Sequence, residues 1–179
     1  MNTSSPLALV GSPGAQGVGP RLVAVPITLR EGNAFVRQYH RHHRPVRGFK
    51  LGIGAEWAGE LIVVVLIGRP VSRVRGEQPI IEVTRLCTDC VQRQIGVNRK
   101  GEPTFVNAAS FLYARAQKVA AAMGCVIGTY ILETEEGVSV RAAGYRFVRK
   151  TRGGSWDRNG RPREDKAPTV PKLLFEAAA

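Results

Sequence analysis

The stretch Leu61-Ile62-Val63-Val64-Val65-Leu66-Ile67 is the longest apolar run in the sequence. It is far shorter than the roughly 18 residues of a membrane-spanning helix, and its β-branched residues suit a central strand. The turn-like segment Trp57-Ala58-Gly59-Glu60 precedes it. Before that turn, apolar and other residues alternate as in a strand with one buried side. We expect the two segments to form a β-hairpin that begins an antiparallel sheet. The alternating apolar residues are Phe49, Leu51, Ile53 and Ala55.

A helix is expected upstream of this hairpin, after a first strand over residues 21–27. Thr28-Leu29-Arg30-Glu31 has the capping-box pattern, in which the Thr and Glu side chains accept bonds from otherwise free backbone amides. Pro45 disfavours helical geometry in the residue before it, so the helix should end near His43. Phe35 and His42 should point away from the core. The stripe expected to face the core holds Leu29, Gly32, Val36, His40 and His43.

Further strand and helix patterns follow downstream. Asn107 is placed to cap a helix that Gly124 ends. The polar stretch 88–104 is expected to be a long loop, and Pro171 should confine the final strand to a sheet edge. The expected apolar face of the helix consists of Leu112, Ala116, Val119 and Met123. The other expected elements are strands over 80–87, 125–132, 145–149 and 169–175, and a short helix over 136–143.

These elements predict an α+β fold with a mixed, mostly antiparallel central sheet flanked by helices. Residues 1–20 are rich in Gly, Ser and Pro without periodicity, so we expect a flexible N-terminal extension. One domain should span 21–176, including a basic loop rich in Gly and Arg over 151–168. Residues 177–179 are expected to form a short tail.

The charge balance indicates an anionic partner. The formal net charge is +12, which is most simply explained by nucleic acid binding. An ordinary basic surface and the phosphates of an acyl-CoA are the alternatives. Three cysteines and no secretory signal favour a reducing cytoplasm, away from membranes. Cys87-Thr88-Asp89-Cys90 is a C-x-x-C pattern, but neither a redox helix nor a second pair of zinc ligands accompanies it.

The three histidines of the chain lie together at the end of the first helix, in Tyr39-His40-Arg41-His42-His43-Arg44-Pro45. An imidazole there is a general base, a metal ligand or a structural hydrogen-bonding group, since its pKa lies near neutrality. Two histidines on one face, beside a tyrosine and several arginines, favour a functional site.

Several separated motifs resemble a known family. The order of elements, with Arg141-Ala142-Ala143-Gly144-Tyr145-Arg146-Phe147 ending the second half, resembles the GNAT acyltransferase fold. The histidine segment, Glu82-Val83-Thr84-Arg85-Leu86-Cys87-Thr88-Asp89, Asn107-Ala108-Ala109-Ser110-Phe111-Leu112-Tyr113 and Gly153-Gly154-Ser155-Trp156 resemble small phage and prophage GNAT-like proteins related to the Mom DNA-modification protein. The resemblance implies transfer of an acyl-type group to an amine of a DNA base, which hides DNA from restriction enzymes.

The resemblance also implies roles for individual residues. His40 or His43 would take the proton of the attacking amine, and Tyr113 or Tyr130 would protonate the departing thiolate. The pantetheine of acetyl-CoA or another acyl-CoA would lie in a splay between two strands, at Leu86, Cys87 and Thr88. Its pyrophosphate would lie on the amides of Asn107, Ala108 and Ser110. The GNAT phosphate loop usually precedes the helix directly, whereas here the partly matching segment 93–98 is followed by the inserted residues 99–103.

DNA would meet the basic regions, with Trp156 either stacking on a flipped base or anchoring its loop. Arg85 is either an ion-pair partner or a substrate clamp. Because Mom-like proteins have been linked to iron, His40 and Glu133 would be its ligands, unless Glu133 is an ordinary strand-end residue. The residues expected to contact substrate or DNA are Tyr39, Arg41, Arg44, Arg47, Lys50, Arg85, Trp156 and Arg158.

Two alternatives to a DNA-modifying enzyme remain at this point. One is an acetyl-CoA-dependent N-acetyltransferase of the same fold that acts on a small amine or a protein. The other is a non-catalytic DNA-binding module with structural histidines. DNA modification predicts DNA binding that weakens steeply with salt, whereas the first alternative predicts acetyl-CoA turnover without DNA. The second alternative predicts that His40→Ala leaves function intact.

Overall fold

The computed structural model describes residues 20–40, 44–154 and 168–178. Arg41, His42, His43, Trp156 and Arg158 lie outside these residues, as does nearly all of the expected N-terminal extension. In the described part of the chain, seven strands form one sheet in the order β1-β2-β3-β4-β7-β9-β8. Neighbouring strands are antiparallel except β4 and β7, which run parallel. The mixed α+β architecture predicted from the sequence is therefore confirmed.

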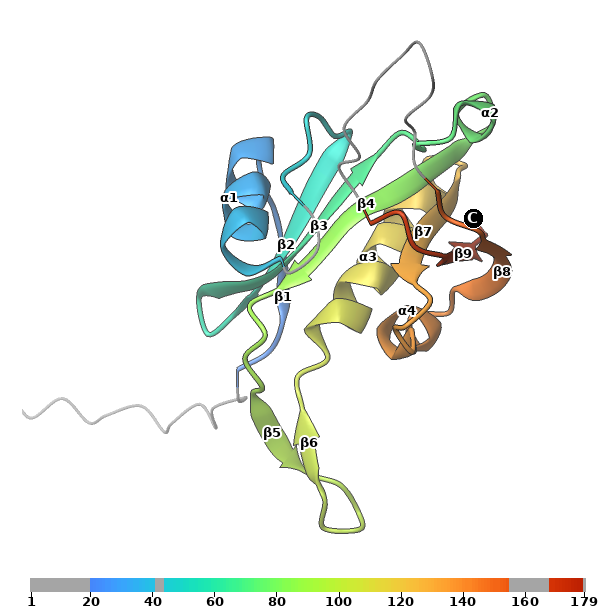
Figure 1. The fold of residues 1–179 in the computed structure, drawn as a ribbon. Coiled ribbons are helices and arrows are strands. Elements are labelled where there is room, and N and C mark those ends of the chain that lie inside the picture. Colours follow the sequence, from blue (N-terminus) through green and yellow to red (C-terminus); the bar gives the residue numbers. More distant parts are fainter. Residues whose placement is uncertain (1–19, 41–43, 155–167, 179) are drawn as a thin grey trace, which may run out of the picture.

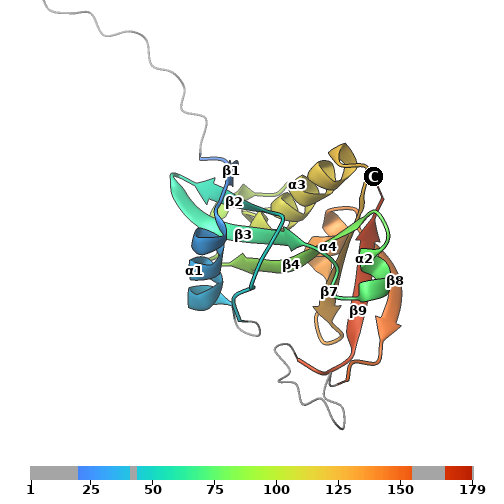
Figure 2. The same ribbon diagram turned by 90° about the horizontal axis from the view of Figure 1, so that it is seen from above.

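Helices cover both faces of the sheet, and Figures 1 and 2 show α1 and α3 on opposite sides of β3 and β4. The strands of the sheet are β1 (Val23–Pro26), β2 (Leu51–Trp57), β3 (Glu60–Gly68), β4 (Ile80–Thr88), β7 (Val126–Leu132), β8 (Arg146–Thr151) and β9 (Lys172–Ala177). The helices are α1 (Leu29–Tyr39), α2 (Arg73–Gly76), α3 (Ala108–Ala122) and α4 (Val138–Ala142). None of these described helices is long and apolar enough to cross a membrane.

Strand β3 is buried on both faces, as its apolar sequence predicts. Val63, Val65 and Ile67 belong to the core beneath α3 and α4, while Val64 and Leu66 belong to the core beneath α1. The hairpin with β2 is also confirmed, and its turn holds Ala58 (φ 51°) and Gly59 (φ 85°) in the left-handed region. Two-residue turns of this type match the twist of the strands they join.

Strand β2 does not have the single buried side that its alternation suggested. Gly52 and Gly54 are buried, and a Cβ on Gly54 would lie 2.5 Å from Leu61 Cδ1 and 3.0 Å from Ile27 Cγ2. The segment between β1 and α1 therefore packs directly onto the backbone of β2. Only glycine leaves room for this approach. The alternation suggested that the glycine side of β2 is exposed, whereas Ile27 packs closely against that side.

Helix α1 is shorter than expected and presents a different face to the core. The capping box at Thr28 is present, but the helix ends at Tyr39 and His40 is already extended (φ −81°, ψ 119°). Phe35 was expected to point away, yet it is 7% exposed and packs with Val36. The chain turns back early because the Asn33 amide donates to Val46 O and accepts from Val46 N, both at 2.9 Å.

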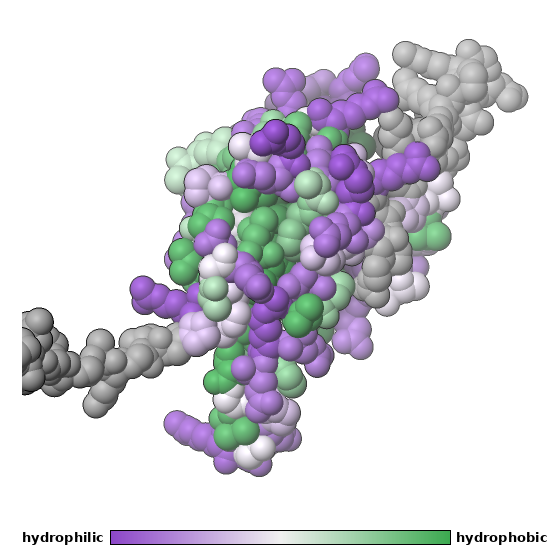
Figure 3. Space-filling view, turned by 90° about the vertical axis from the view of Figure 1, so that its left-hand side faces the viewer, coloured by the Kyte–Doolittle hydropathy of each residue, from purple (hydrophilic) through white to green (hydrophobic). Residues whose placement is uncertain are grey.

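The expected loop over 88–104 contains a second, two-stranded sheet of β5 (Gln94–Val97) and β6 (Pro103–Phe105). This hairpin projects from the body in Figure 1, and Figure 3 shows hydrophobic residues along it. Its Gly and Pro residues resemble those of a loop. The strands were missed because each is very short and neither contributes to a core.

The last strand, β9, lies between β7 and β8 rather than at an edge. Pro171 was expected to exclude it from the interior, but Pro171 precedes the strand, so its missing amide interrupts no strand pairing. Its carbonyl accepts from Glu133 N at 3.2 Å. Strand β8 is the edge strand at this end of the sheet. Helix α3 also buries a slightly different stripe, because Ala120 is in the core and Met123 is 44% exposed.

Candidate functional site

The parallel strands β4 and β7 separate halfway along their length. They pair only where Ile80–Val83 lies beside Val126–Thr129. Beyond that point β4 continues to Thr88 paired with β3, and β7 continues to Leu132 paired with β9. Facing edges of the two strands thus carry backbone amides and carbonyls that the sheet does not pair. Such groups need partners, and an extended ligand that contains amides supplies them.

A β-bulge in β4 lies at the point of separation. The register with β3 passes from Val83 opposite Ile67 to Arg85 opposite Leu66, which leaves Thr84 as the extra residue. The Thr84 hydroxyl donates to Leu66 O at 3.0 Å. Because a bulge re-aims the residues that follow it, Cys87 joins the core under α1 and Leu86 packs against the core under α3.

A pocket of about 250 Å³ lies at the end of β4, beside the N-terminus of α3. Its lining comes from the start of β3, the end of β4 and the segment after it, and the residues that lead into α3, namely Ile62, Thr88, Asp89, Cys90, Val91, Gln92, Phe105, Val106, Asn107, Ala108 and Ala109. The first amides of a helix have no intrahelical acceptor. Asn107 Oδ1 accepts from Ser110 N at 3.3 Å, so the amides of Ala108 and Ala109 remain for a ligand.

Some of the residues predicted to bind the donor line the pocket and others do not. Thr88, Asn107 and Ala108 line the pocket. Ser110 donates its hydroxyl to Asn107 Oδ1 at 2.8 Å and so completes the helix cap. Cys87 is buried beneath α1, where burial raises the pKa of its thiol to about 12.

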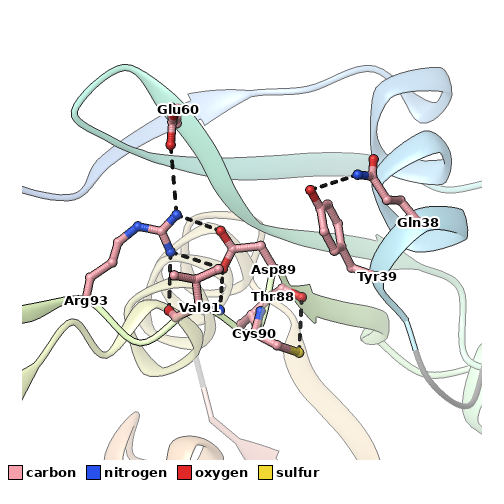
Figure 4. Close-up of polar contacts among 8 residues, drawn as sticks. All are labelled: Gln38, Tyr39, Glu60, Thr88, Asp89, Cys90, Val91 and Arg93. Carbon is pink, nitrogen blue, oxygen red and sulfur yellow. Dashed lines mark hydrogen bonds and ion pairs between the residues drawn. The ribbon is translucent and has the colours of Figure 1, made fainter.

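Asp89 of the pocket lining forms an ion pair with Arg93. Arg93 donates to both carboxylate oxygens of Asp89, with Nη2–Oδ2 at 2.7 Å and Nη1–Oδ1 at 3.1 Å (Figure 4). Hydrogen bonding to Asp89 raises the pKa of Arg93. Asp89 Oδ1 also accepts from Val91 N at 3.0 Å, and Arg93 O accepts from Val106 N at 2.9 Å. The base of the β5–β6 hairpin is thereby held against the body, and the Asp89 charge is compensated.

The other face of the separated strands receives the segment that follows α1. Arg85 donates from Nε to Arg44 O at 3.0 Å and from Nη1 to the Thr84 carbonyl. Burial lowers the pKa of Arg85. Arg85 therefore ties the end of the histidine segment to β4 one residue beyond the bulge. The side chain of His40 is only half-buried.

The remaining residues of the expected substrate surface lie along α1 and the segment after it. The Tyr39 ring packs on Phe35 at 4.7 Å between centroids, and its hydroxyl accepts from Gln38 at 2.9 Å (Figure 4). Arg44, Arg47 and Lys50 are exposed. Of this expected surface, the structure brings Arg85 and the backbone of Arg44 into contact.

Glu82 is the residue that sequence reasoning missed. It lies in β4 just before the bulge and is only 4% exposed, and its Oε2 accepts from Val71 N at 3.4 Å. Burial raises the pKa of Glu82 to about 7, against the opposing charges of Arg75, Lys172 and Arg85. The available signal was a carboxylate between the apolar strand residues Ile81 and Val83. A carboxyl group that titrates near neutrality is suited to accept a proton at physiological pH.

The two candidate tyrosines lie on opposite faces of the sheet. Tyr113 is 7% exposed in the core under α3, where burial raises the pKa of its hydroxyl to about 12. Tyr130 is the first β7 residue beyond the last pair with β4, and it is half-buried. The next residue, Ile131, packs against the core under α3. Because adjacent residues of a strand point to opposite faces, Tyr130 points away from α3, on the same face as its β9 partner Leu174.

Glu133 follows β7, and its half-exposed carboxylate forms an ion pair with Lys150 of β8. Among the described residues, no group of three or more His, Cys, Asp or Glu side chains is arranged to hold a metal ion. Iron binding by His40 and Glu133 thus remains a prediction from the sequence.

Comparison with solved structures identifies the architecture. A polyamine N-acetyltransferase from Drosophila melanogaster matches with a TM-score of 0.57 at 12% identity, covering 89% of this chain and 100% of that one. An acetyltransferase from Salmonella typhimurium, determined with acetyl-CoA, matches with a TM-score of 0.56 at 13% identity, covering 88% and 93%. A GNAT-family acetyltransferase from Streptococcus pneumoniae matches with a TM-score of 0.54 at 10% identity, covering 88% and 99%. The chain has the GNAT acetyltransferase fold. No protein-family model and no curated protein sequence matches it.

The two halves of the site can be compared with acetyl-CoA, the cofactor with which the Salmonella neighbour was determined. The separated edges of β4 and β7 fit an extended pantetheine, and the amides of Ala108 and Ala109 fit a phosphate at a helix N-terminus. Pairing with Arg93 keeps the Asp89 carboxylate from opposing a phosphate there. The residues present therefore fit an acyl-CoA. The β5–β6 hairpin is inserted between β4 and α3, in the segment expected to hold the phosphate loop.

Proposed function

We propose that this protein is an acyl-CoA-dependent N-acyltransferase that modifies an exocyclic amine of a DNA base. The observation that carries the proposal is the separation of β4 from β7, with a helix N-terminus at one end and the Glu82–Arg85 face beside it. A bound acyl-CoA supplies an activated thioester carbonyl. The amine forms the new C–N bond, the C–S bond breaks, and the thiolate leaves.

The residues of the chain position the reactants and move the protons. The free edge of β4 around Leu86 and Thr88 holds the pantetheine in an extended conformation. Glu82 accepts the proton of the amine, directly or through one water, because its carboxyl group is ionised in about half of the molecules near pH 7. Tyr130, at the separation point, is placed to return a proton to the thiolate. His40 is the alternative base.

The charge distribution supports a nucleic acid acceptor. A net charge of +12 repels cationic polyamines and attracts a phosphate backbone. Exposed Arg44, Arg47 and Lys50 follow α1, and exposed Arg146 and Arg149 lie on edge strand β8. The exocyclic amine of a nucleobase is neutral at pH 7, so it needs a base only as it attacks. A relation to phage DNA-modification proteins, and protection of DNA from restriction, are part of this proposal.

Mass spectrometry of nucleosides from DNA of cells that express the protein tests this function. The expected result is a new nucleoside with an added acyl mass, which disappears in Glu82→Gln and persists in the exposed-site control Glu136→Gln. Loss of the product in His40→Ala but not in Glu82→Gln would reassign the base. Purified protein should also bind duplex DNA with an affinity that falls steeply with salt.

An acetyl-CoA-dependent enzyme for small amines or proteins is the second candidate. It is favoured by an unchanged nucleoside profile together with release of free thiol from acetyl-CoA in the presence of an amine or peptide. A ribosomal-protein-alanine N-acetyltransferase from Escherichia coli is among the proteins of similar fold, at 9% identity and a TM-score of 0.53. Protein N-termini therefore belong in that screen.

A further inference from the structure

Three residues form a row across the sheet beside the proposed site. Glu82 of β4 pairs with Gly128 of β7, and Gly128 pairs with Glu176 of β9. Neighbouring strands lie about 4.8 Å apart, so the two glutamates stand on the same face about 10 Å from each other. Gly128 leaves a gap between them because it has no side chain.

The guanidinium of Arg75 fills this gap. Arg75 comes from the short helix α2, and its Nη1 lies 2.5 Å from Glu176 Oε1. A Cβ placed on Gly128 would lie 2.8 Å from Arg75 Nη2, which is too close for a real side chain. The other atoms nearest that Cβ, from Glu176 and Leu174, are both at an ordinary 3.6 Å. Position 128 must therefore be glycine for the guanidinium of Arg75 to lie where it does.

In the described part of the chain, the guanidinium of Arg75 has hydrogen-bond donors that are not used. Its side chain is 12% exposed, and its Nε and Nη2 atoms are buried without a hydrogen-bond partner among the described residues. The contact with Glu176 is an ion pair without hydrogen-bond alignment, since Glu176 Oε1 likewise lacks such a bond. The positive charge of Arg75 lowers the pKa of Glu82, as do the charges of Lys172 from β9 and Arg85 from β4.

We propose that Arg75, seated on Gly128 and held by Glu176, is a positioning residue that keeps the buried Glu82 in its charged, proton-accepting form. The inference rests on the proposed function in that Glu82 is the base there. Arg75 touches neither reactant and acts through Glu82 alone. Burial by itself favours the neutral carboxylic acid, and the Val71 amide and the nearby cations, of which Arg75 has the largest effect, oppose it.

The pH dependence of kcat/KM tests this role. In wild type the acidic limb should lie near pH 7, where Glu82 ionises. Loss of a neighbouring charge in Arg75→Gln should move the limb up by about one pH unit, so that activity falls about five-fold at pH 7 and recovers near pH 9. Arg75→Lys, which keeps the charge, should restore at least half of the displacement. Arg73→Gln changes an exposed arginine of the same helix and should not move the limb.

A glycine pair gives an independent test on the backbone. Gly128→Ala should displace the guanidinium and move the limb in the same direction as Arg75→Gln. Gly68→Ala is the matched control, because Gly68 of β3 pairs with Glu82 from the strand on the side away from β7. A Cβ on Gly68 would meet Thr84 Cγ2 at an ordinary 3.4 Å. An unmoved limb in both Arg75→Gln and Gly128→Ala, or an equal movement in Arg73→Gln, overturns the proposal.

A titration of the Glu82 carboxyl carbon by ¹³C NMR separates this inference from the proposed function. The resonance is assigned by its loss in Glu82→Gln, and the titration needs no substrate. An upward movement of the Glu82 midpoint in Arg75→Gln supports the role of Arg75 even if no acyl transfer is found. A midpoint that stays within about 0.3 pH unit of wild type, in a folded variant, overturns it.

Discussion

Glu82→Gln should stabilise the protein, and only above mildly acidic pH. The folded protein holds the Glu82 proton more tightly than the unfolded chain does, because burial raises the pKa from its ordinary 4.5 to about 7. The stability that this proton contributes is fully present below pH 4.5 and is lost as the pH rises to about 7. Glutamine keeps the shape of the side chain and an oxygen that can accept from Val71 N, but it has no proton to lose.

The expected magnitude follows from the same two pKa values. Their difference, at about 1.4 kcal/mol per pH unit, corresponds to about 3 kcal/mol. The free energy of unfolding of Glu82→Gln should therefore exceed that of wild type by about 3 kcal/mol more at pH 8 than at pH 4. Most of this change should occur between pH 4.5 and pH 7, because the linkage slope vanishes outside that window.

Urea denaturation followed by tryptophan fluorescence, at five pH values from 4 to 8, measures this difference. Other titrating groups cancel because only the difference between variant and wild type is used. Glu136→Gln, which removes a carboxylate at an exposed position, is the matched control. If the difference for Glu82→Gln stays constant within about 0.5 kcal/mol over this range, Glu82 does not titrate near neutrality and the reasoning fails.

Three further predictions concern the scaffold. Asn107→Ala should lower the free energy of unfolding by about 1 kcal/mol in urea through loss of the α3 cap, and Asn107→Ser should retain most of it. Gly32→Ala should cost about 1–3 kcal/mol, because its Cβ would lie 2.5 Å from Leu66 Cδ2, whereas Gly48→Ala meets nothing within 4 Å and should leave the melting temperature unchanged. Replacing residues 95–104 by two glycines should alter stability by less than about 1 kcal/mol in thermal unfolding, since a two-stranded hairpin adds little stability of its own; a larger loss would mean that the arm supports the body.

The candidate site was only partly predictable. The sequence predicted donor-binding roles for Thr88, Asn107 and Ala108, and all three line the pocket. Their positions were predictable because a strand end and a helix cap are local patterns. Glu82 and Arg75 were missed because their significance depends on burial. In the sequence Glu82 resembles any other acidic residue, and only packing by β3, β7 and α2 buries it. Arg75 likewise resembles the other arginines, and only the space above Gly128 allows its guanidinium to lie there.

What the sequence by itself determined is the set of elements whose signals are local. The apolar run of β3, the capping box at Thr28 and the turn at Gly59 depend on neighbours a few residues away, and all three were predicted. The tertiary structure decided the place of β9 inside the sheet, the separation of β4 from β7, and the row from Glu82 to Glu176. These features depend on pairing between residues about 20 to 50 positions apart. Side-chain periodicity tells which face a residue takes, but not which strand lies beside it.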